Sequence, residues 1–212
     1  MSGASGGWVC LVPAKPPSVG KSRLALPDEA RRELATAFAL DTASAARLAS
    51  RVAVVLAVTD DARFADRFAM LGCRVVPDGV GGDLNGSLVQ AAAEARRRWP
   101  DLRPVALCAD LPALRPADLD EALAAAEDVD GPSYVVDADG VGTTLYAAPS
   151  YDGFAPRFGG GSAVAHTAAG ATPLGGVLAG LRRDVDTAAD VRTAAALGLG
   201  AHSAAAVARL EI

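Results

Sequence analysis

Short apolar runs alternate along the chain with longer segments in which apolar residues recur every three or four positions. The runs at residues 8–12 and 51–58 are the clearest, and the second is rich in valine. Continuous apolar runs of this length are typical of parallel strands that are covered on both faces. Since the segments between them have the spacing of helices, the pattern predicts repeated βα units and an α/β fold with a mostly parallel sheet.

The remaining elements follow from the same pattern and from residues that begin or end helices. Pro27, Asp28 and Glu29 have the residue types of a first helical turn, and Gly72 is placed to end the second helix. Further strands are predicted at residues 73–76, 105–108, 133–136 and 143–147. Helices are predicted at residues 27–50, 60–72, 84–99, 116–127, 188–197 and 201–210, and a turn at residues 137–140.

The composition supports a single globular domain. Of the 212 residues, 51% are hydrophobic and 21% are charged, which excludes a disordered chain. Aromatic residues make up 5%, so the core is expected to consist of small and branched side chains on sheet faces, which favours α/β over an all-β sandwich. No linker or repeat divides the chain. We expect one domain spanning residues 1–212, with residues 1–7 as a flexible amino terminus.

The net charge of −5 argues against a nucleic-acid-binding protein, because such proteins need a surplus of Lys and Arg on one face. Any phosphate that the protein binds is therefore expected on a small molecule. The amino terminus does not have the pattern of a signal peptide, and no apolar run is long enough to span a bilayer. We expect a cytoplasmic protein with no membrane partner, in which Cys10, Cys73 and Cys108 are buried thiols.

The segment at residues 8–24, WVCLVPAKPPSVGKSRL, joins the first strand to the first helix through a loop that carries three cations. They are Lys15, Lys21 and Arg23. Cationic side chains at the end of a buried strand are well placed to bind a phosphate. The alternative is that Lys21 and Arg23 are solvated surface charges.

This loop is not a Walker phosphate-binding loop. Gly20, Lys21 and Ser22 match the second half of the motif G-x-x-x-x-G-K-[ST], but Lys15 stands where its first glycine would be. Two prolines that follow remove backbone N–H groups that such a loop uses as donors. Cationic side chains, rather than a backbone nest, are therefore expected to meet the anion.

Two acidic sites follow strands or precede helices. Asp110 comes directly after an apolar strand, where a carboxylate could hold a divalent cation, although a turn or helix-cap role is the alternative. Asp184 and Asp186 lie on the same face if their segment is extended. Asp186 or Thr187 also has the position of a helix N-cap. We favour Asp184 for chemistry and Asp186 for capping.

Two glycine-rich loops also contain hydroxyl groups, GVGTT at residues 140–144 and FGGGS at residues 158–162. Their backbone N–H and side-chain O–H groups could approach a carboxylate or phosphate, although the same residue types form ordinary turns. His166 follows in an alanine-rich segment that is predicted to begin a helix. We interpret His166 as structural or as a minor anion contact.

Six motifs, taken in order, resemble those of one enzyme family. They are VPAKPPSVGKSRLA, DLNGSL, ADLPALRPADL, GTTL, RFGGGSA with the following His166, and RRDVDT. The chain thereby resembles the phospholactate or phosphoenolpyruvate guanylyltransferases, which make the activated phospho-acid precursor of the deazaflavin coenzyme F-420. These enzymes share the fold of the nucleotide-sugar transferases, and the molybdopterin nucleotidyltransferases have the same fold. The resemblance extends from about Val9 to Leu199.

The resemblance implies a Rossmann-like, three-layer α/β/α nucleotidyltransferase fold and a reaction between GTP and a phosphorylated three-carbon acid. Phosphoenolpyruvate is the expected acid, with 2-phospho-L-lactate as the second choice, and pyrophosphate is released. One or two Mg²⁺ ions would bridge the two substrates. No protein nucleophile is needed, because the phosphate of the acid is itself the nucleophile.

The resemblance also implies the roles of individual residues. Those expected to bind the phospho-acid are Thr143, Gly159 and Ser162. Those expected to hold the metal are Asp110, Asp184 and, as a third candidate, Asp186. Those expected to meet the nucleotide are Lys15, Lys21, Arg23 and Asn85, and Lys21 and Arg23 are also expected to stabilise the departing pyrophosphate.

Two alternatives remain at this stage. A molybdopterin nucleotidyltransferase would have the same fold, but its first loop is normally richer in glycine, whereas Pro16 and Pro17 stand here. A non-catalytic nucleotide-binding protein would keep the fold without turnover. Nothing in the sequence excludes a homo-oligomer.

Overall fold

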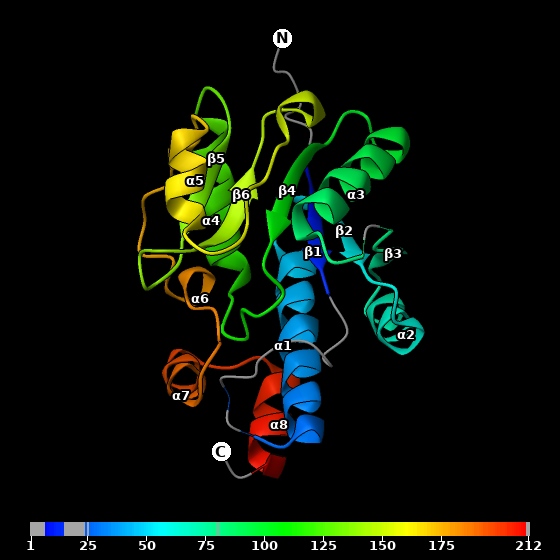
Figure 1. Ribbon diagram of the computed structural model, residues 1–212, viewed down its shortest axis with the longest axis vertical. Coiled ribbons are helices and arrows are strands. Elements are labelled where there is room, and N and C mark those ends of the chain that lie inside the picture. Colours follow the sequence, from blue (N-terminus) through cyan, green and yellow to red (C-terminus); the bar gives the residue numbers. More distant parts are fainter. Residues whose placement is uncertain (1–6, 15–23, 25, 80, 211–212) are drawn as a thin grey trace.

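A single seven-stranded sheet organises the chain, as Figure 1 shows for the computed structural model. The structure describes residues 7–14, 24, 26–79 and 81–210. The strands are β1 (Trp8–Pro13), β2 (Val52–Val58), β3 (Arg74–Val76), β4 (Arg103–Leu107), β5 (Ser133–Val136), β6 (Thr143–Ala147) and β7 (Thr172–Pro173). The helices are α1 (Asp28–Leu48), α2 (Ala62–Met70), α3 (Leu84–Arg98), α4 (Pro116–Glu127), α5 (Ser162–Ala168), α6 (Ala179–Arg182), α7 (Ala188–Leu197) and α8 (Ala201–Leu210), with a 3₁₀ turn at Tyr151–Gly153.

The strand order in the sheet is β3-β2-β1-β4-β6-β5-β7. Strands β1 to β4 pair in parallel, and β5 pairs in parallel with β7. Strand β6 is antiparallel to both of its neighbours, β4 and β5. The predicted mostly parallel α/β sheet is confirmed, and the reversed β6 brings its first residues to the carboxyl end of β4.

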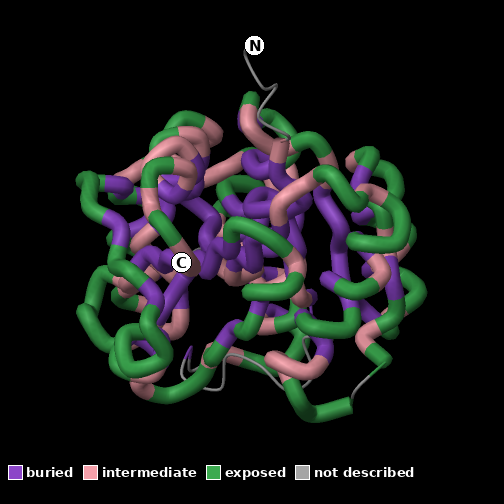
Figure 2. Tube along the Cα trace, turned by 90° about the horizontal axis from the view of Figure 1, so that it is seen from above, coloured by how far each residue is buried: buried purple, intermediate pink, exposed green. Residues whose placement is uncertain are grey.

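Helices cover both faces of the sheet and make three layers. One core contains side chains of α1, α2 and α4 packed against alternate residues of β1, among them Trp8, Cys10 and Val12. The other contains α3 and α5 packed against the opposite face, including Val9 and Leu11. This alternation explains why β1 has no polar position, since both faces of a central parallel strand are covered. In Figure 2 the buried residues lie along the inner strands and the exposed ones along the outer loops and helix surfaces.

A third apolar cluster joins the first half of α1 to α7 and α8, which close the chain below the carboxyl ends of the strands (Figure 1). A buried carboxylate reinforces this contact. Asp41 of α1 is 6% exposed, and its oxygens accept hydrogen bonds from the backbone N–H groups of His202 (3.1 Å) and Ser203 (2.7 Å) in the first turn of α8. The Asp41 carboxylate thereby satisfies two donors that have no partner within α8.

Replacing Asp41 with alanine is expected to lower the free energy of unfolding by about 1–2 kcal/mol, because the first turn of α8 would lose the acceptor of two N–H groups. Urea denaturation at neutral pH measures the change. Asp152→Ala is the matched control, since the Asp152 side chain is 77% exposed and pairs only with the exposed Arg96. That control should change the free energy by less than about 0.5 kcal/mol, and equal losses in both variants would contradict the capping role of Asp41.

The strands and helices predicted from the sequence overlap the observed ones. Asp61 caps α2 by accepting from the Phe64 N–H (2.9 Å), and Gly72 ends that helix with a φ of 82°. Strand β7, helix α6 and the 3₁₀ turn were not predicted, because two to four residues are too few to show a period.

The cysteines agree largely with expectation. Cys10 and Cys73 are buried and Cys108 is partly buried, all as free thiols. Burial raises the pKa of the Cys73 thiol to about 11. In the part of the chain that the structure describes, no helix is long and apolar enough to cross a membrane.

Candidate functional site

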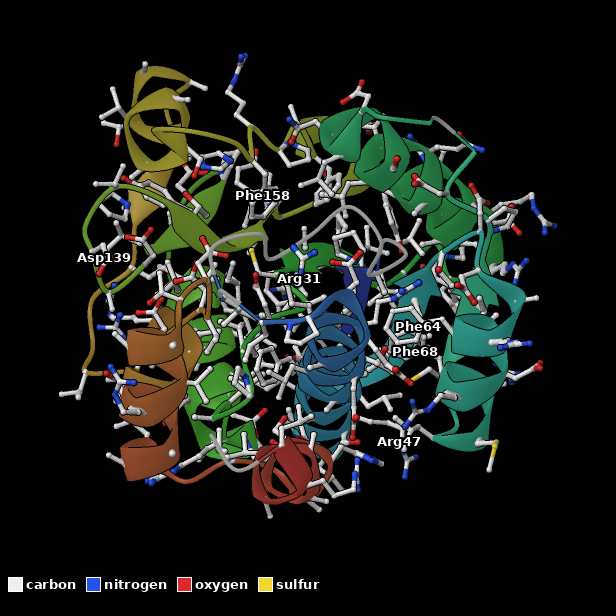
Figure 3. All side chains as sticks on the ribbon, turned by 60° about the horizontal axis from the view of Figure 1, so that its bottom comes forward. Arg31, Arg47, Phe64, Phe68, Asp139 and Phe158 are labelled. Atoms are coloured by element: carbon white, nitrogen blue, oxygen red, sulfur yellow. The ribbon has the colours of Figure 1, made fainter. Side chains whose placement is uncertain are left out.

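The predicted site residues of the described chain gather where the parallel strands end. Figure 3 views the molecule with this side turned forward. Asp110 follows β4, and the start of β6 lies beside it because Leu107 pairs with Leu145 in the antiparallel ladder. Two hydrogen bonds join these segments. The Cys108 N–H donates to the Thr144 carbonyl oxygen (2.9 Å), and the Cys108 thiol donates to the Thr143 carbonyl oxygen (3.3 Å). The carboxylate segment after β4 is thereby held against the hydroxyl-bearing start of β6.

Asp184 joins Asp110 from a distant part of the chain. The N–H of Val185 donates to the backbone carbonyl of Asp110 (3.1 Å), so the two aspartate segments run side by side. Burial, together with the negative charges of Asp110, Asp137 and Asp186, raises the pKa of Asp184 to about 7. Several carboxylates therefore crowd one half-buried place, which a bound cation would stabilise.

Asp137 is a member of this group that sequence reasoning did not select. Its carboxylate accepts from the backbone N–H groups of Val141 (2.9 Å) and Gly142 (2.6 Å), which closes the predicted turn. A Cβ at Gly142 would lie 2.3 Å from Asp137 Oδ2, so a larger residue there would displace this carboxylate. In the sequence, Asp137 is recognisable only as a turn residue. Its charge effect on the pKa of Asp184 is what connects it with the site.

The capping prediction for Asp186 was wrong. Thr187 is the N-cap of α7, and it forms a reciprocal capping box with Asp190. Asp190 accepts from the backbone N–H groups of Thr187 (2.8 Å) and Asp186 (3.2 Å) and from the Thr187 hydroxyl (2.7 Å). The signal was present in the sequence as a threonine followed three residues later by an acid. The negative charge of Asp186 acts instead on Asp184, whose pKa it helps to raise.

The two glycine-hydroxyl loops are held together. The Ser162 N–H donates to the Gly159 carbonyl (3.2 Å), and the Ala163 N–H donates to the Val141 carbonyl (3.1 Å). Gly159 and Gly161 have φ values of 140° and 70°, which L side chains rarely adopt. The second loop is therefore a tight turn that places Ser162 next to the loop before Thr143, and their predicted binding of the phospho-acid stays a prediction.

His166 connects these loops from inside α5. Its ring is fully buried. Nδ1 lies 3.0 Å from the Thr143 hydroxyl oxygen, and Nε2 accepts a hydrogen bond from the Arg157 N–H at 2.8 Å. The structural role expected of His166 is thus confirmed, and it includes a direct contact with a predicted substrate-binding residue.

Asn85 bridges α3 to the second loop. Its amide nitrogen donates to the Phe158 carbonyl (3.0 Å), and its amide oxygen accepts from the Phe158 N–H (2.8 Å). Phe158 is partly buried and packs against the same core cluster as α3 and α5, and it is labelled in Figure 3. The nucleoside contact predicted for Asn85 stays a prediction, and what the structure shows is a two-point brace of the loop that begins with Phe158.

The predicted cations Lys15, Lys21 and Arg23 lie outside the described residues. Two other arginines lie near the site and were not selected from the sequence. Arg157 acts on the pKa values of His166 and Tyr146 through its charge, which places it near these two rings. Arg31 of α1 points toward the middle of the view in Figure 3. Its Nε is buried without a hydrogen-bond partner among the described residues.

One cavity of the described residues lies away from these groups. It has a volume of about 430 Å³ and lies between β3 and α3, lined by residues such as Val76, Pro77 and Gln90. None of the predicted site residues that the structure describes lines it. The carboxylate and hydroxyl groups of the candidate site therefore lie outside this cavity.

Within the described residues, no three His, Cys, Asp or Glu side chains form a group that could hold a metal ion by themselves. Asp110 and Asp184 provide the carboxylate oxygens that Mg²⁺ prefers, and Mg²⁺ commonly completes its shell with water and substrate phosphates. The crowding of negative charge at Asp184 fits such an ion. The residues present therefore fit a cation that is shared with phosphorylated substrates.

The chain is similar over nearly its whole length to phosphoenolpyruvate guanylyltransferases. It is 50% identical over 202 residues to that of Salinispora arenicola, covering 93% of this chain and 92% of that protein. It is 47% identical over 205 residues to that of Thermomonospora curvata, covering 96% and 90%. It is 45% identical over 208 residues to that of Streptomyces coelicolor, covering 97% and 98%. No protein-family model matches the chain.

Solved structures share the fold at much lower identity. Rv0371c from Mycobacterium tuberculosis H37Rv superposes with a TM-score of 0.59 at 24% identity, covering 90% of this chain and 97% of that one. The enzyme 4-diphosphocytidyl-2C-methyl-D-erythritol synthase superposes with a TM-score of 0.56 at 11% identity, covering 90% and 98%. These similarities show a nucleotidyltransferase-like α/β fold.

Proposed function

Because this chain belongs to the phosphoenolpyruvate guanylyltransferase family, we propose that it transfers GMP from GTP to the phosphate of phosphoenolpyruvate and releases pyrophosphate. In this reaction a phosphate oxygen of the acid forms a bond to the α-phosphorus of GTP. The bond from that phosphorus to the bridging oxygen of the β-phosphate breaks, and the bond's electron pair leaves with pyrophosphate.

The observation that carries the proposal is the meeting of the Asp110 and Asp184 segments with the loops of Thr143 and Ser162. Both substrates are anions, so their mutual repulsion must be reduced before the phosphate can attack. The repulsion is reduced if carboxylates hold a cation on one side of the site and hydrogen-bond donors bind the acid on the other. The end of β1, from which the cationic loop starts, lies in the same sheet next to β4.

In the proposed arrangement Asp110 and Asp184 hold Mg²⁺, with Asp186 as a third candidate. The ion would supply neutralising charge for the two substrates when bound. Thr143, Ser162 and the backbone at Gly159 bind and orient the phospho-acid. Their hydrogen bonds hold one of its oxygens toward the nucleotide.

On the nucleotide side, Lys15, Lys21 and Arg23 are proposed to bind the triphosphate, and Lys21 and Arg23 to stabilise the charge that develops on pyrophosphate. Asn85 stays the candidate for the nucleoside side. No side chain has to act as nucleophile or general base, because a phosphate dianion attacks without losing a proton. We also propose that the product enters the synthesis of the deazaflavin coenzyme F-420.

Pyrophosphate release tests the proposal. The protein is incubated with Mg²⁺ and either GTP or CTP, together with phosphoenolpyruvate, 2-phospho-L-lactate or 3-phosphoglycerate. The expected result is release that requires GTP and is fastest with phosphoenolpyruvate. Release that is fastest with 2-phospho-L-lactate would keep the guanylyltransferase reaction and change its acceptor.

The same assay separates the two alternatives. A molybdopterin nucleotidyltransferase would release no pyrophosphate with any of the phospho-acids, and would release it once molybdopterin is added as the acceptor. A non-catalytic nucleotide-binding protein would bind GTP and Mg²⁺ but release no pyrophosphate with any acceptor. Either outcome would overturn the proposed function.

A further inference from the structure

We infer that His166 is a positioning residue of the acid site: its ring holds the Thr143 hydroxyl oxygen, so that the hydroxyl hydrogen is directed to an oxygen of the phospho-acid. The inference rests on the proposed function for the identity of that acid. The positioning itself rests on the hydrogen bonds and packing of His166.

The first step is the tautomer of the ring. The Arg157 N–H donates to Nε2 at 2.8 Å, and a backbone N–H can only donate. Nε2 therefore carries a lone pair, and the hydrogen of the neutral ring is on Nδ1. Because Nδ1 lies 3.0 Å from the Thr143 Oγ1, it donates to that oxygen. The backbone of Ser162 is an acceptor for the ring, since it acts to raise the pKa of His166, so the hydrogen on Nδ1 is shared between Ser162 and Thr143.

The second step is that packing holds the ring in place. It stacks on Tyr134 and Tyr146, with centroid distances of 5.4 Å and 4.8 Å, and meets the edge of Phe158 at 5.7 Å. Burial, together with the nearby Arg157 charge, lowers the pKa of His166 to about 4. The ring thus stays neutral near physiological pH, and protonation does not compete with the bond from Arg157.

The third step concerns the Thr143 hydroxyl. Its oxygen accepts from His166, so its own hydrogen is available to a further acceptor. Ionised carboxylate and phosphate groups only accept hydrogen bonds, which makes an acid oxygen the matching partner. A free hydroxyl rotates, whereas one held by a buried donor is already oriented. His166 therefore prepares Thr143 for an acid without touching the acid.

Three substitutions separate the two ring contacts. In His166→Asn the amide N–H takes the place of Nδ1–H and can still donate to Thr143. In His166→Gln the amide oxygen takes the place of Nε2. It can still accept from the Arg157 N–H, but the bond to the Thr143 hydroxyl is lost. In His166→Phe the ring packing remains and both contacts are lost.

We expect the KM for phosphoenolpyruvate to rise about 10-fold in His166→Gln and His166→Phe, and less than about 3-fold in His166→Asn. The KM for GTP should change less than about 2-fold in all three. His202→Gln is the matched control, since His202 is the other of the two histidines and belongs to α8. A purely structural role would lower kcat or change both KM values together, and that result would overturn the inference.

A double-mutant cycle tests whether His166 acts through Thr143. In a Thr143→Val background the hydroxyl is absent, so His166→Gln should raise the KM for phosphoenolpyruvate no further. Independent losses that multiply would show that His166 does not act through this hydroxyl. Circular dichroism and thermal unfolding of each variant identify any that fail to fold. If His166→Gln or His166→Phe fails to fold, the test is whether His166→Asn keeps a KM for phosphoenolpyruvate within about 3-fold of the parent protein.

The tautomer of His166 can be measured by spectroscopy, without an activity assay. Nitrogen-15 NMR of the intact protein distinguishes a protonated Nδ1 from a protonated Nε2, and His202→Gln assigns the two histidines. A ring protonated on Nε2 overturns the inference even if the protein is an active guanylyltransferase. A ring protonated on Nδ1 in a protein that releases no pyrophosphate overturns the proposed function, while the link between His166 and Thr143 stands.

Discussion

Replacing Asp184 with asparagine is expected to slow pyrophosphate release from GTP and phosphoenolpyruvate by about 10²- to 10³-fold, because the site would lose a negative charge that is proposed to hold Mg²⁺. Thermal stability should stay the same or increase. The pKa of the Asp184 carboxyl is raised by burial and by Asp110, Asp137 and Asp186, which means that its charge is unfavourable in the folded protein without a cation. Initial rates over a range of Mg²⁺ concentrations, with thermal unfolding of the same samples, measure both effects.

The matched control for this variant is Asp139→Asn. The Asp139 side chain is 78% exposed, it lies at the left edge of Figure 3, and it pairs with Arg183 at 3.5 Å. The substitution removes one negative charge from the same region without touching the carboxylates that face Asp184, so the rate should change less than about 2-fold. Full activity in Asp184→Asn would remove Asp184 from the site, and a large loss in both variants would point to the general charge of this region.

Replacing Gly180 with alanine is expected to lower the free energy of unfolding by about 3 kcal/mol, or more. A Cβ there would lie 2.1 Å from the backbone carbonyl oxygen of Ala113, which cannot move without shifting the segment after Asp110. The Gly180 N–H also donates to Asp118 of α4 at 3.1 Å, so α6 is held close on two sides. The expected loss corresponds to a fall in Tm of about 6–12 °C for a chain of this size.

Gly175→Ala is the control for the backbone effect. A Cβ at Gly175 meets nothing within 4 Å, and its φ lies outside the range that only glycine adopts readily. The Tm of this control should change by no more than about 2 °C. Calorimetry of both variants decides the comparison. A Gly180→Ala protein as stable as the parent chain would mean that α6 is not packed against Ala113 as the structure shows.

The strands and long helices could be predicted because their signals are local. A valine-rich run such as residues 51–58 and a helical period such as that of α1 depend on neighbours only a few residues apart. Asp61 and Gly72 could be assigned to helix ends for the same reason. The short elements β7 and α6 have no such signal, since they are held by contacts with distant segments rather than by their own periodicity.

The candidate site was predicted in part. Asp110 followed from its position after a strand, and the roles of Thr143 and Ser162 came from the resemblance of short motifs to a known family. The capping role went to Thr187 rather than Asp186, although the spacing to Asp190 could have been recognised. Asp137 could not have been selected as a site residue from the sequence. Aspartates are common in turns, and Asp184, whose pKa it affects, is 47 positions away.

By itself the sequence determined which segments form strands and helices, that the fold is α/β, and which family the motifs resemble. Only the tertiary structure decided that β6 runs against its neighbours, so that Thr143 lies beside the segment of Asp110. It also decided that the buried ring of His166 lies between the Thr143 hydroxyl and the Arg157 N–H. The physical reason is range: periodicity and capping act within a few residues, whereas strand order, burial and the partners of a buried ring depend on segments that meet only after folding.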